Sequence, residues 1–241
     1  MIKNKVIISA VVSATVIGSF YTLAGPGSSG SSEHQQIIKD QILTDLDSSR
    51  TLGMALEHRQ RCKSFRWEDE TDQQGRQLVK YTCDMDISES NNLWKGGFEK
   101  YIKDVTFFLR GEKAYIEEKQ GSCQSEINPS YCMENIAYKK KAIISANKTV
   151  ELASELNNVS VTQTKQIITW SVLKGAEYPV TLLSSVYKYK LSSGEEYDVN
   201  QTKGVMNDVY GNSNTLNPMP VLVRQKLNKL RCDADNKSGY C

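Results

Sequence analysis

The most regular pattern in the chain is an alternation of apolar and polar residues from Val79 to Ile87. Its apolar positions are Val79, Tyr81, Cys83, Met85 and Ile87, and every residue between them is polar. A period of two predicts a β-strand with one buried face. A shorter alternation around Phe65 and Trp67 precedes it, and a polar turn with Gly75 near its end separates the two. Together the segments predict an antiparallel hairpin.

A period of three to four residues marks the helical parts. Within residues 33–58 several apolar residues follow helical spacing, and Ser32 is placed to cap the first turn. These residues are Ile38, Ile42, Leu43 and Leu46. A polar break at 47–49 leaves two alternatives, one long kinked helix or two short helices. Residues 133–157 carry isolated apolar residues on a polar background, which predicts another helix.

Short apolar runs predict further strands in both halves of the chain. In the first half, Val105–Leu109 and Ala114–Glu118 flank four mainly polar residues and predict a second hairpin. In the second half the predicted strands are Gln166–Trp170, residues 184–191, residues 195–199 and Pro220–Arg224. Each half would then contain a helical region followed by about four strands.

The N-terminal segment predicts export. Lys3 and Lys5 precede nineteen uncharged residues, Val6–Ala24, a pattern typical of an export signal. Thr22 and Ala24 suit a cleavage site, whereas the length of about 20 residues is also close to that of a membrane span. A cleaved signal and a retained membrane anchor therefore both stay open for residues 1–24. Residues 25–32, GPGSSGSS, have the composition of a flexible linker.

The six cysteines all lie beyond residue 60, and their number is even, which in an exported chain predicts disulfides. Of the fifteen full pairings that six cysteines allow, the local one is the simplest: Cys62–Cys83, Cys123–Cys132 and Cys232–Cys241. The last two pairs each enclose eight residues and end in Tyr-Cys. Cys62 has the wrong parity to share a strand face with Phe65 unless a β-bulge intervenes, and this argues against the Cys62–Cys83 pair.

The matching cysteine segments and the similar order of elements predict an internal repeat. We expect an α+β fold of two similar, disulfide-stapled units, residues 33–132 and 133–241. Each would be a helix packed on an antiparallel sheet of about four strands. Cystatin-like and small NTF2-like folds have this architecture, and the analogy concerns the fold alone.

The charge and the histidine content exclude several classes of partner. Lys3 and Lys5 are the charged residues of the first 24, and the rest of the chain has 28 basic and 28 acidic residues. Nucleic-acid-binding surfaces are normally basic, so this neutrality argues against a nucleic-acid partner. The chain has no CxxC motif and its histidines are His34 and His58, which argues against a metal, redox or other cofactor site.

Two sets of residues could in principle carry catalysis. His58 and Cys62 could form a base and a nucleophile, but in an exported chain this cysteine is expected to be oxidised. Two acidic clusters could supply the carboxylate pair of a glycoside hydrolase: Glu68, Asp69, Glu70 and Asp72, and Glu195, Glu196 and Asp198. Both clusters fall in predicted hairpin turns, where acidic residues are common without any catalytic role.

Three other patterns have plainer structural explanations. Asp233, Asp235 and Gly239 match part of a calcium loop, but the bidentate Glu of that motif is missing. Tyr187 and Tyr189 alternate with lysines, as in a base-stacking surface, and equally as in a half-exposed strand. The basic stretch at 223–231 could contact an acidic partner or anionic lipid, and it equally suits a solvated helix or strand face.

The sequence therefore assigns no catalytic, cofactor-binding or metal-binding residue. We expect an exported, non-enzymatic binding or assembly protein of the cell envelope that contacts another protein, in the periplasm or secreted, with a membrane tether through residues 1–24 still open. The alternative is a secreted or periplasmic hydrolase whose carboxylates converge only in the fold. A third hypothesis is a carrier with an apolar cavity between helix and sheet.

Overall fold

The computed structural model describes residues 31–211 and 217–234, which form two compact units. The first unit contains residues 31–86, 163–189 and 196–211, and the second contains residues 87–162, 190–195 and 217–234. Each unit therefore combines segments that are far apart in the sequence. The predicted division at residue 132 stays a prediction.

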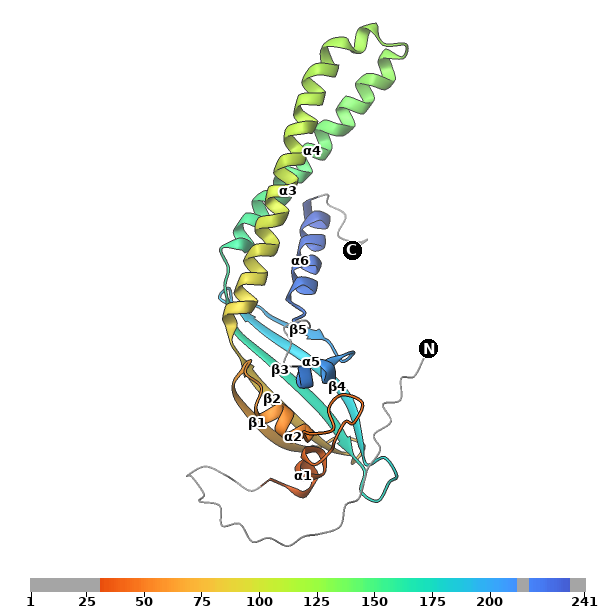
Figure 1. Cartoon of the computed structure of the whole chain (residues 1–241). Helices are drawn as coiled ribbons and strands as arrows, with labels where there is room; N and C mark the ends of the chain where they lie inside the picture. The colour runs from red at the N-terminus through yellow and green to blue at the C-terminus, as the bar shows by residue number, and fades with distance from the viewer. Residues whose placement is uncertain (1–30, 212–216, 235–241) are drawn as a thin grey trace. The chain divides into compact units, whose positions relative to one another are not determined.

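A five-stranded sheet lies mainly in the first unit (Figure 1). Its strands are β1 (Cys62–Thr71), β2 (Gln77–Met85), β3 (Val161–Val172), β4 (Val180–Leu191) and β5 (Glu196–Asn200). They lie side by side in chain order, and the pairs β1–β2 and β2–β3 are antiparallel. The sheet and its helices confirm the predicted α+β class. The strands predicted around Phe65, within 79–87 and at 166–170, 184–191 and 195–199 all fall within or overlap these five.

The core of the first unit uses the alternating face predicted for β2. Val79, Tyr81 and Cys83 on this strand have no exposed surface, and on β3 Ile168 and Trp170 are also buried. Alternation places successive side chains on opposite faces of a strand, so one face of the sheet collects these residues. The predicted strand pattern and the observed core therefore agree.

Three short helices complete the first unit. They are α1 (Glu33–Lys39), α2 (Leu52–Glu57) and α5 (Val205–Gly211). The Oγ of Ser32 accepts a hydrogen bond from the backbone N–H of Gln35, as the sequence predicts, and Thr51 caps α2 in the same way. Of the two alternatives for residues 33–58, the structure has two short helices.

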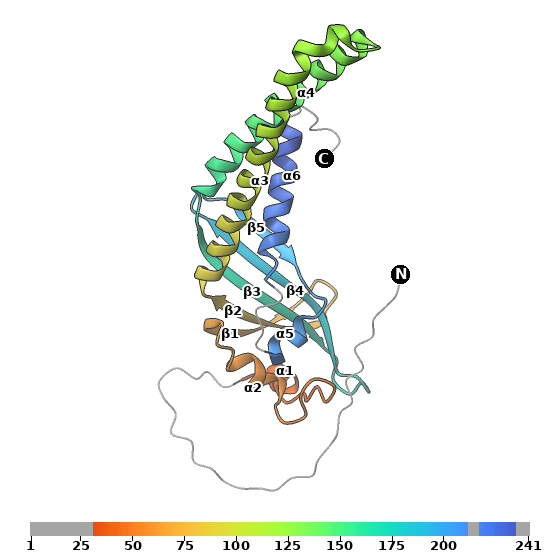
Figure 2. The same cartoon turned by 45° about the horizontal axis from the view of Figure 1, so that its top comes forward.

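The second unit is built from helices. It contains α3 (Ile87–Ser122), the short 3₁₀ helix η1 (Cys123–Ser125), α4 (Pro129–Asn157) and α6 (Met219–Ala234). Helices α3 and α4 run antiparallel as a long hairpin, and α6 lies beside its lower part (Figures 1 and 2). The helix predicted for residues 133–157 is confirmed as part of α4. Asn128 caps this helix, and Pro129 occupies its first turn.

The hairpin predicted for Val105–Leu109 and Ala114–Glu118 is wrong, because both segments belong to α3. A short apolar run fits a strand and a buried helix equally well, and length has to decide between them. Here the apolar residues Val105, Leu109, Ile116 and Cys123 follow one another at spacings of four and seven, which is a helical pattern. The strand predicted for Pro220–Arg224 is wrong for the same reason, because it forms the start of α6.

The structure does not show the two similar units that the sequence predicts. One five-stranded sheet contains strands from both halves of the chain, and long helices occupy positions where the repeat required strands. The Cys123–Cys132 disulfide joins the ends of α3 and α4 (Cα–Cα 5.5 Å). The predicted pair Cys232–Cys241 lies outside the described residues, because Cys241 is not among them.

No helix in the described part of the chain is long and apolar enough to cross a membrane. Residues 1–24, for which the export signal is predicted, lie outside the described residues, as does most of the 25–32 linker. The disulfides indicate an oxidising environment, which agrees with export.

Candidate functional site

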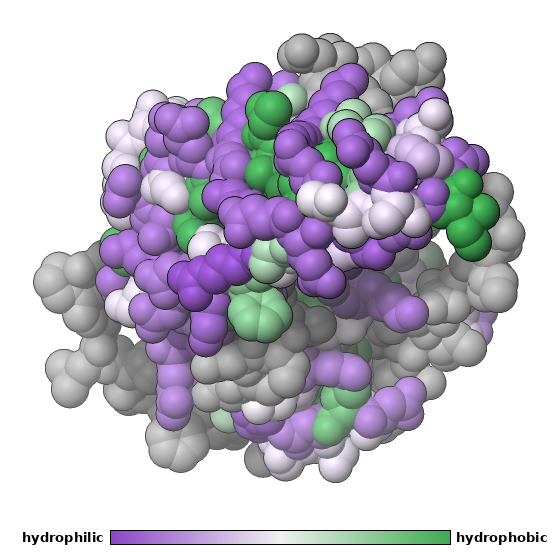
Figure 3. All heavy atoms as spheres, turned by 90° about the horizontal axis from the view of Figure 1, so that it is seen from above, coloured by the Kyte–Doolittle hydropathy of each residue, from purple (hydrophilic) through white to green (hydrophobic). Residues whose placement is uncertain are grey.

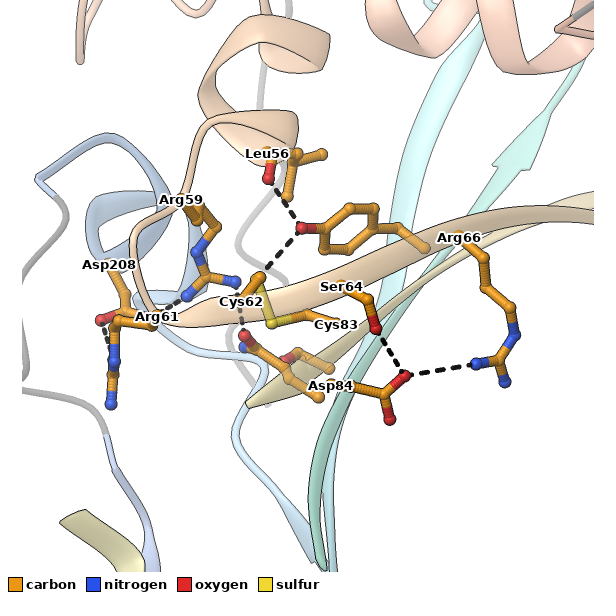
Figure 4. Close-up of a disulfide and its surroundings, with 12 residues drawn as sticks. Leu56, Arg59, Arg61, Cys62, Ser64, Arg66, Cys83, Asp84 and Asp208 are labelled. Carbon is orange, nitrogen blue, oxygen red and sulfur yellow. Dashed lines mark hydrogen bonds and ion pairs between the residues drawn. A yellow bond between two sulfur atoms is a disulfide. The ribbon is translucent and has the colours of Figure 1, made fainter. Parts of the chain in front are cut away.

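A buried cluster of charged residues lies beside β1 in the first unit (Figure 4). Arg59 Nη2 donates a hydrogen bond to Asp208 Oδ2 over 2.8 Å, and Arg59 Nη1 donates to Gln166 Oε1 over 2.7 Å. Arg61 Nη1 donates to the other carboxylate oxygen of Asp208 over 3.0 Å. The side chains of Arg59 and Asp208 are completely buried, and that of Arg61 is 8% exposed. The cluster thereby connects the α2–β1 loop to α5 and β3.

A disulfide lies next to this cluster. Cys62 and Cys83 have Cα atoms 5.3 Å apart, and the β1–β2 register shifts between Cys62 and Ser64. This shift is the bulge that the parity of Cys62 requires. The hydroxyl of Tyr81 lies 3.3 Å from Cys62 Sγ and donates to the Leu56 carbonyl over 2.7 Å. Burial raises the pKa of Tyr81 to about 12.

The chemistry of this cluster is that of a structural connection. Both oxygens of Asp208 accept from guanidinium groups, and Gln166 passes the network on by donating to Ser185 Oγ over 3.0 Å. Pairing and hydrogen bonding offset the cost of burying a carboxylate, and Asp208 has both. These groups hold the loop before β1 against α5, and none of them lines either of the two hollows described below.

The sequence candidates for catalysis do not assemble into an active site. His58 is the C-terminal cap of α2, and Cys62 is in a disulfide, so it supplies no thiolate. One acidic cluster lies on β1 and the turn after it, and the other lies at the start of β5. β1 and β5 are the opposite edges of the sheet, which are about 19 Å apart at ~4.8 Å per strand. Paired carboxylates of glycoside hydrolases are at most about 9.5 Å apart.

The acidic residues of both clusters are engaged in local contacts. Asp69 accepts hydrogen bonds from Ser32 and Gln35, and Asp198 forms an ion pair with Lys188. Asp72 accepts from the backbone N–H of Arg76, which lowers the pKa of its carboxyl group. A general acid needs a raised pKa, and this one is shifted in the opposite direction.

The other sequence candidates are equally structural. Tyr187 and Tyr189 are buried with stacked rings, and the lysines between and after them are exposed, as alternation in a strand requires. The basic stretch 223–231 lies in α6. Of the calcium-like residues, Asp233 lies in the last turn of this helix, and Asp235 and Gly239 lie outside the described residues.

The second unit presents a different kind of surface, along the α3–α4 hairpin. The seam between the two helices repeats at spacings of four and three on both helices, which is the pattern of a coiled coil. On α3 and the η1 turn that follows it, the seam residues are Val105, Leu109, Glu112, Ile116, Lys119 and Cys123, and on α4 they are Cys132, Ile136, Lys139, Ile143, Ala146 and Val150. Ile116, Cys123 and Ile136 form a small buried core near the tip.

Helix α6 covers one side of the lower part of this hairpin. A Cβ atom on Gly97 would lie 2.7 Å from Val223 of α6, so this position of α3 has room only for glycine. One turn further along, the guanidinium of Arg231 lies over the ring of Tyr101 at 5.2 Å. On α4, Thr149 is 2% exposed. The side of α3 that α6 covers is therefore the side of Gly97 and Tyr101, and α6 also contacts α4, on which Thr149 is buried.

Above the end of α6 the same side of the hairpin carries exposed aromatic residues. Eighteen residues make five helical turns, so Tyr115 lies directly above Gly97 on α3, and Tyr131 lies directly beyond Thr149 on α4. Phe108 and Tyr138 lie within about 20° of these two directions, at 100° per residue. The exposed fractions are Phe108 58%, Tyr115 37%, Tyr131 66% and Tyr138 74%. We call these four residues the distal aromatic face.

Two hollows lie on other parts of the hairpin surface. One, of about 630 Å³, is lined by α3 residues that include Lys103, Phe107 and Arg110. The other, of about 440 Å³, lies between α3 and α4 and is lined by residues that include Ile116, Lys140 and Ile144. On the face of the molecule seen in Figure 3, hydrophobic residues are interspersed with hydrophilic ones. The exposed apolar groups seen there form separate spots rather than one continuous sheet.

Comparisons of the chain with protein-family models, with curated proteins and with solved structures found no match. Sequence reasoning missed the distal aromatic face, because it assigned residues 105–118 to strands. The signal was present: Tyr101, Phe108 and Tyr115 follow one another at intervals of seven residues. Such a spacing keeps residues on one side of a coiled-coil hairpin.

Proposed function

We propose that this chain is an exported, non-enzymatic binding or assembly protein of the cell envelope, and that it contacts another protein through the distal aromatic face of the α3–α4 hairpin. The observation that carries the proposal is the exposure of four aromatic side chains on one side of the hairpin. Single exposed apolar residues are normal on protein surfaces, whereas several on one face indicate an interaction site.

The residue types support a protein partner. Tyrosine and phenylalanine are enriched in protein–protein interfaces, where their rings bury a large area and lose little conformational entropy. Three of the four residues are tyrosines, whose hydroxyl groups can stay hydrated while the ring is unbound. Such a surface stays soluble when it is free, and its burial by a partner lowers the free energy of the complex.

The position of the face also supports helix packing. α6 already packs on this side of the lower hairpin, with Met219, Leu222 and Val223 buried. The seam continues towards the tip, with the Glu112–Lys139 ion pair among its apolar residues, so the upper part offers a further groove between α3 and α4. A partner helix there would extend the arrangement that α6 begins.

The hairpin is held in a defined shape. The Cys123–Cys132 disulfide closes its tip, and the Nζ of Lys139 lies 2.5 Å from the Glu112 carboxylate across the seam. Lys139 also lies over the ring of Tyr115 at 4.7 Å. A preorganised surface loses less entropy on binding, which favours affinity.

Export rests on the N-terminal pattern together with the disulfides. Lys3 and Lys5 followed by Val6–Ala24 fit a periplasmic or a secreted protein, and a retained segment would tether the chain in the inner membrane. The hydrolase alternative finds no support in the acidic clusters, which lie on opposite edges of the sheet.

Site-specific photo-crosslinking tests the contact. A photoreactive phenylalanine analogue is introduced at Tyr138 in the exported protein, and its matched control is introduced at Ile144, which is 70% exposed on a different side of α4. We expect a protein adduct from position 138 in the producing cells and little or none from position 144. Equal adducts at both positions, or none at 138, would contradict the proposed contact surface.

A further inference from the structure

We propose that the partner of the distal aromatic face is a second copy of this chain, with two hairpins packed antiparallel along this face. The inference rests on the proposed function and specifies its partner. Three observations lead to it: the area of the face, the position of small residues at its centre, and the distribution of charge at its two ends.

The area of the face suits a protein interface. An aromatic side chain removes about 150–250 Å² from water when fully buried, so the exposed fractions of the four residues leave roughly 470 Å² of aromatic surface. A stable interface buries about 800 Å² on each partner. The four rings supply more than half of that area, and the residues between them can supply the rest.

The centre of the face allows close approach. Tyr101, beneath the end of α6, and Cys123, at the tip, are 22 residues apart, or about 33 Å along the helix. The midpoint falls at Glu112, next to Gly111, where an added Cβ would meet no atom within 4 Å. On α4 the small residue Ala142 lies on the same side. A two-fold axis through this level would place each Phe108 near the tip-side rings of the other copy.

The ends of the face carry opposite charges. Near the tip, Glu118 and Glu134 are exposed acidic residues, and Glu126 is balanced by its ion pair with Lys119. The last part of α6, at the other end, is basic, with exposed Lys229 and Arg231. In an antiparallel pair the acidic tip of each copy lies against the basic α6 end of the other copy, so the dimer contains this contact two times.

This charge pattern favours a second copy over a different helix. A uniformly acidic partner would be attracted to the α6 end and repelled by the tip, and a uniformly basic partner would show the reverse. A second copy in antiparallel orientation matches both ends at once. Complementary charges of this kind fix orientation and speed association.

Light scattering on the purified exported protein gives the first test, measured as mass against concentration. We expect twice the monomer mass at micromolar concentration. Phe108→Asp should weaken the dimer at least about thirtyfold, as expected for a central interface residue. The adjacent Phe107, 78% exposed and about 100° away on the helix, gives the matched control, because Phe107→Asp should leave the dimer intact.

Charge reversal gives the second test, and it examines orientation. One variant carries Glu118→Lys and Glu134→Lys at the tip, and the other carries Lys229→Glu and Arg231→Glu at the end of α6. Each variant alone should dimerise weakly, because like charges then meet at both ends. Mixing the two should restore the dimer, since every tip then meets an oppositely charged α6 end. An unchanged helix content in the circular dichroism spectrum of each variant excludes misfolding as the cause.

The outcomes separate this inference from the proposed function. A monomer at every concentration, or a dimer that Phe108→Asp leaves unchanged, overturns pairing through this face. If the photoreactive residue at 138 then still forms an adduct with a different protein, the contact surface stands and the second copy is wrong. If position 138 forms no adduct at all, the proposed function fails with it.

Discussion

The two compact units place tyrosine residues in opposite environments. In the first unit Tyr81, Tyr187 and Tyr189 are at most 1% exposed, whereas in the second Tyr131 and Tyr138 are 66% and 74% exposed. A sheet covered on one face buries every second side chain, so an alternating tyrosine enters the core. A two-helix hairpin buries only its narrow seam, and an aromatic residue outside the seam stays in water unless a further helix covers it.

The same contrast holds for charged residues. Asp208 is completely buried between Arg59 and Arg61 in the first unit. Glu112 and Lys139 pair across the seam in the second unit, with side chains 21% and 26% exposed. The first unit is therefore organised around groups removed from water, and the second around groups that water or a partner can reach.

Breaking the buried cluster should have the largest effect. Asp208→Ala leaves two buried guanidinium groups without their carboxylate, and breaking a buried pair in this way costs about 3–5 kcal/mol. Urea unfolding followed by tryptophan fluorescence measures the loss. Asp198→Ala is the control, because its pair with Lys188 is exposed and contributes about 0–1 kcal/mol. Equal effects of the two substitutions would show that burial does not decide the contribution.

Alkaline pH should weaken the first unit through its buried tyrosines. Burial raises the pKa of Tyr81 and of Tyr187 to about 12, above the ordinary value of about 10. The contribution of each tyrosine hydroxyl to the free energy of unfolding is therefore complete below pH 10, and it is lost as the pH rises from 10 to 12. A change from about 10 to about 12 corresponds to at most about 2.7 kcal/mol for each tyrosine.

Urea unfolding between pH 9 and pH 12 measures this dependence. The double variant Tyr81→Phe/Tyr187→Phe keeps the ring packing and removes both titrating groups, so its stability should fall less steeply over this range. The hydroxyl of Tyr81 donates to Leu56, and its loss should cost about 1 kcal/mol at neutral pH. Parallel curves for the two proteins would mean that other groups govern the alkaline loss.

Removing the tip disulfide should loosen the second unit alone. The cysteines of the pair are nine residues apart, and closing a loop of this size contributes about 2.6 kcal/mol in the chain-entropy model. Hydrogen exchange of Cys123→Ser/Cys132→Ser should accelerate in α3 and α4 near the tip and stay unchanged in β2 and β3. Cys62→Ser/Cys83→Ser is the counterpart and should accelerate exchange in the sheet. Identical exchange patterns for the two variants would show that the units unfold as one.

The sequence predicts the sheet well because its signal is local. The alternation from Val79 to Ile87 identifies β2 and its buried face. The parity of Cys62 argued against its pairing with Cys83, and the bulge before Ser64 is what makes the pair possible. The seam of the hairpin was harder to find. Its apolar residues are spaced over 36 residues of α3, and the short run at Val105–Leu109 fits a strand equally well when it is considered alone.

The two candidate sites also differ in whether a local sequence pattern indicates them. The pairing of Arg59 with Asp208 joins residues 149 positions apart, and no local pattern indicates it. The distal aromatic face does have a sequence signal, the seven-residue interval from Tyr101 to Phe108 and Tyr115. That signal has meaning only after the segment is known to be helical, since the same letters in a strand would place these residues on both faces.

The smallest predicted effect concerns the ion pair of the seam. Glu112 and Lys139 occupy positions where a coiled coil normally has apolar residues, and desolvation of a partly buried pair offsets much of its attraction. Glu112→Leu combined with Lys139→Leu should therefore stabilise the second unit by about 1 kcal/mol, after the loss of the contact between Lys139 and Tyr115. Thermal unfolding of the double variant and of each single variant measures the effect. A destabilised double variant would show that the pair is needed to fix the alignment of the two helices, and the seam would then resemble the Arg59–Asp208 cluster despite its exposure.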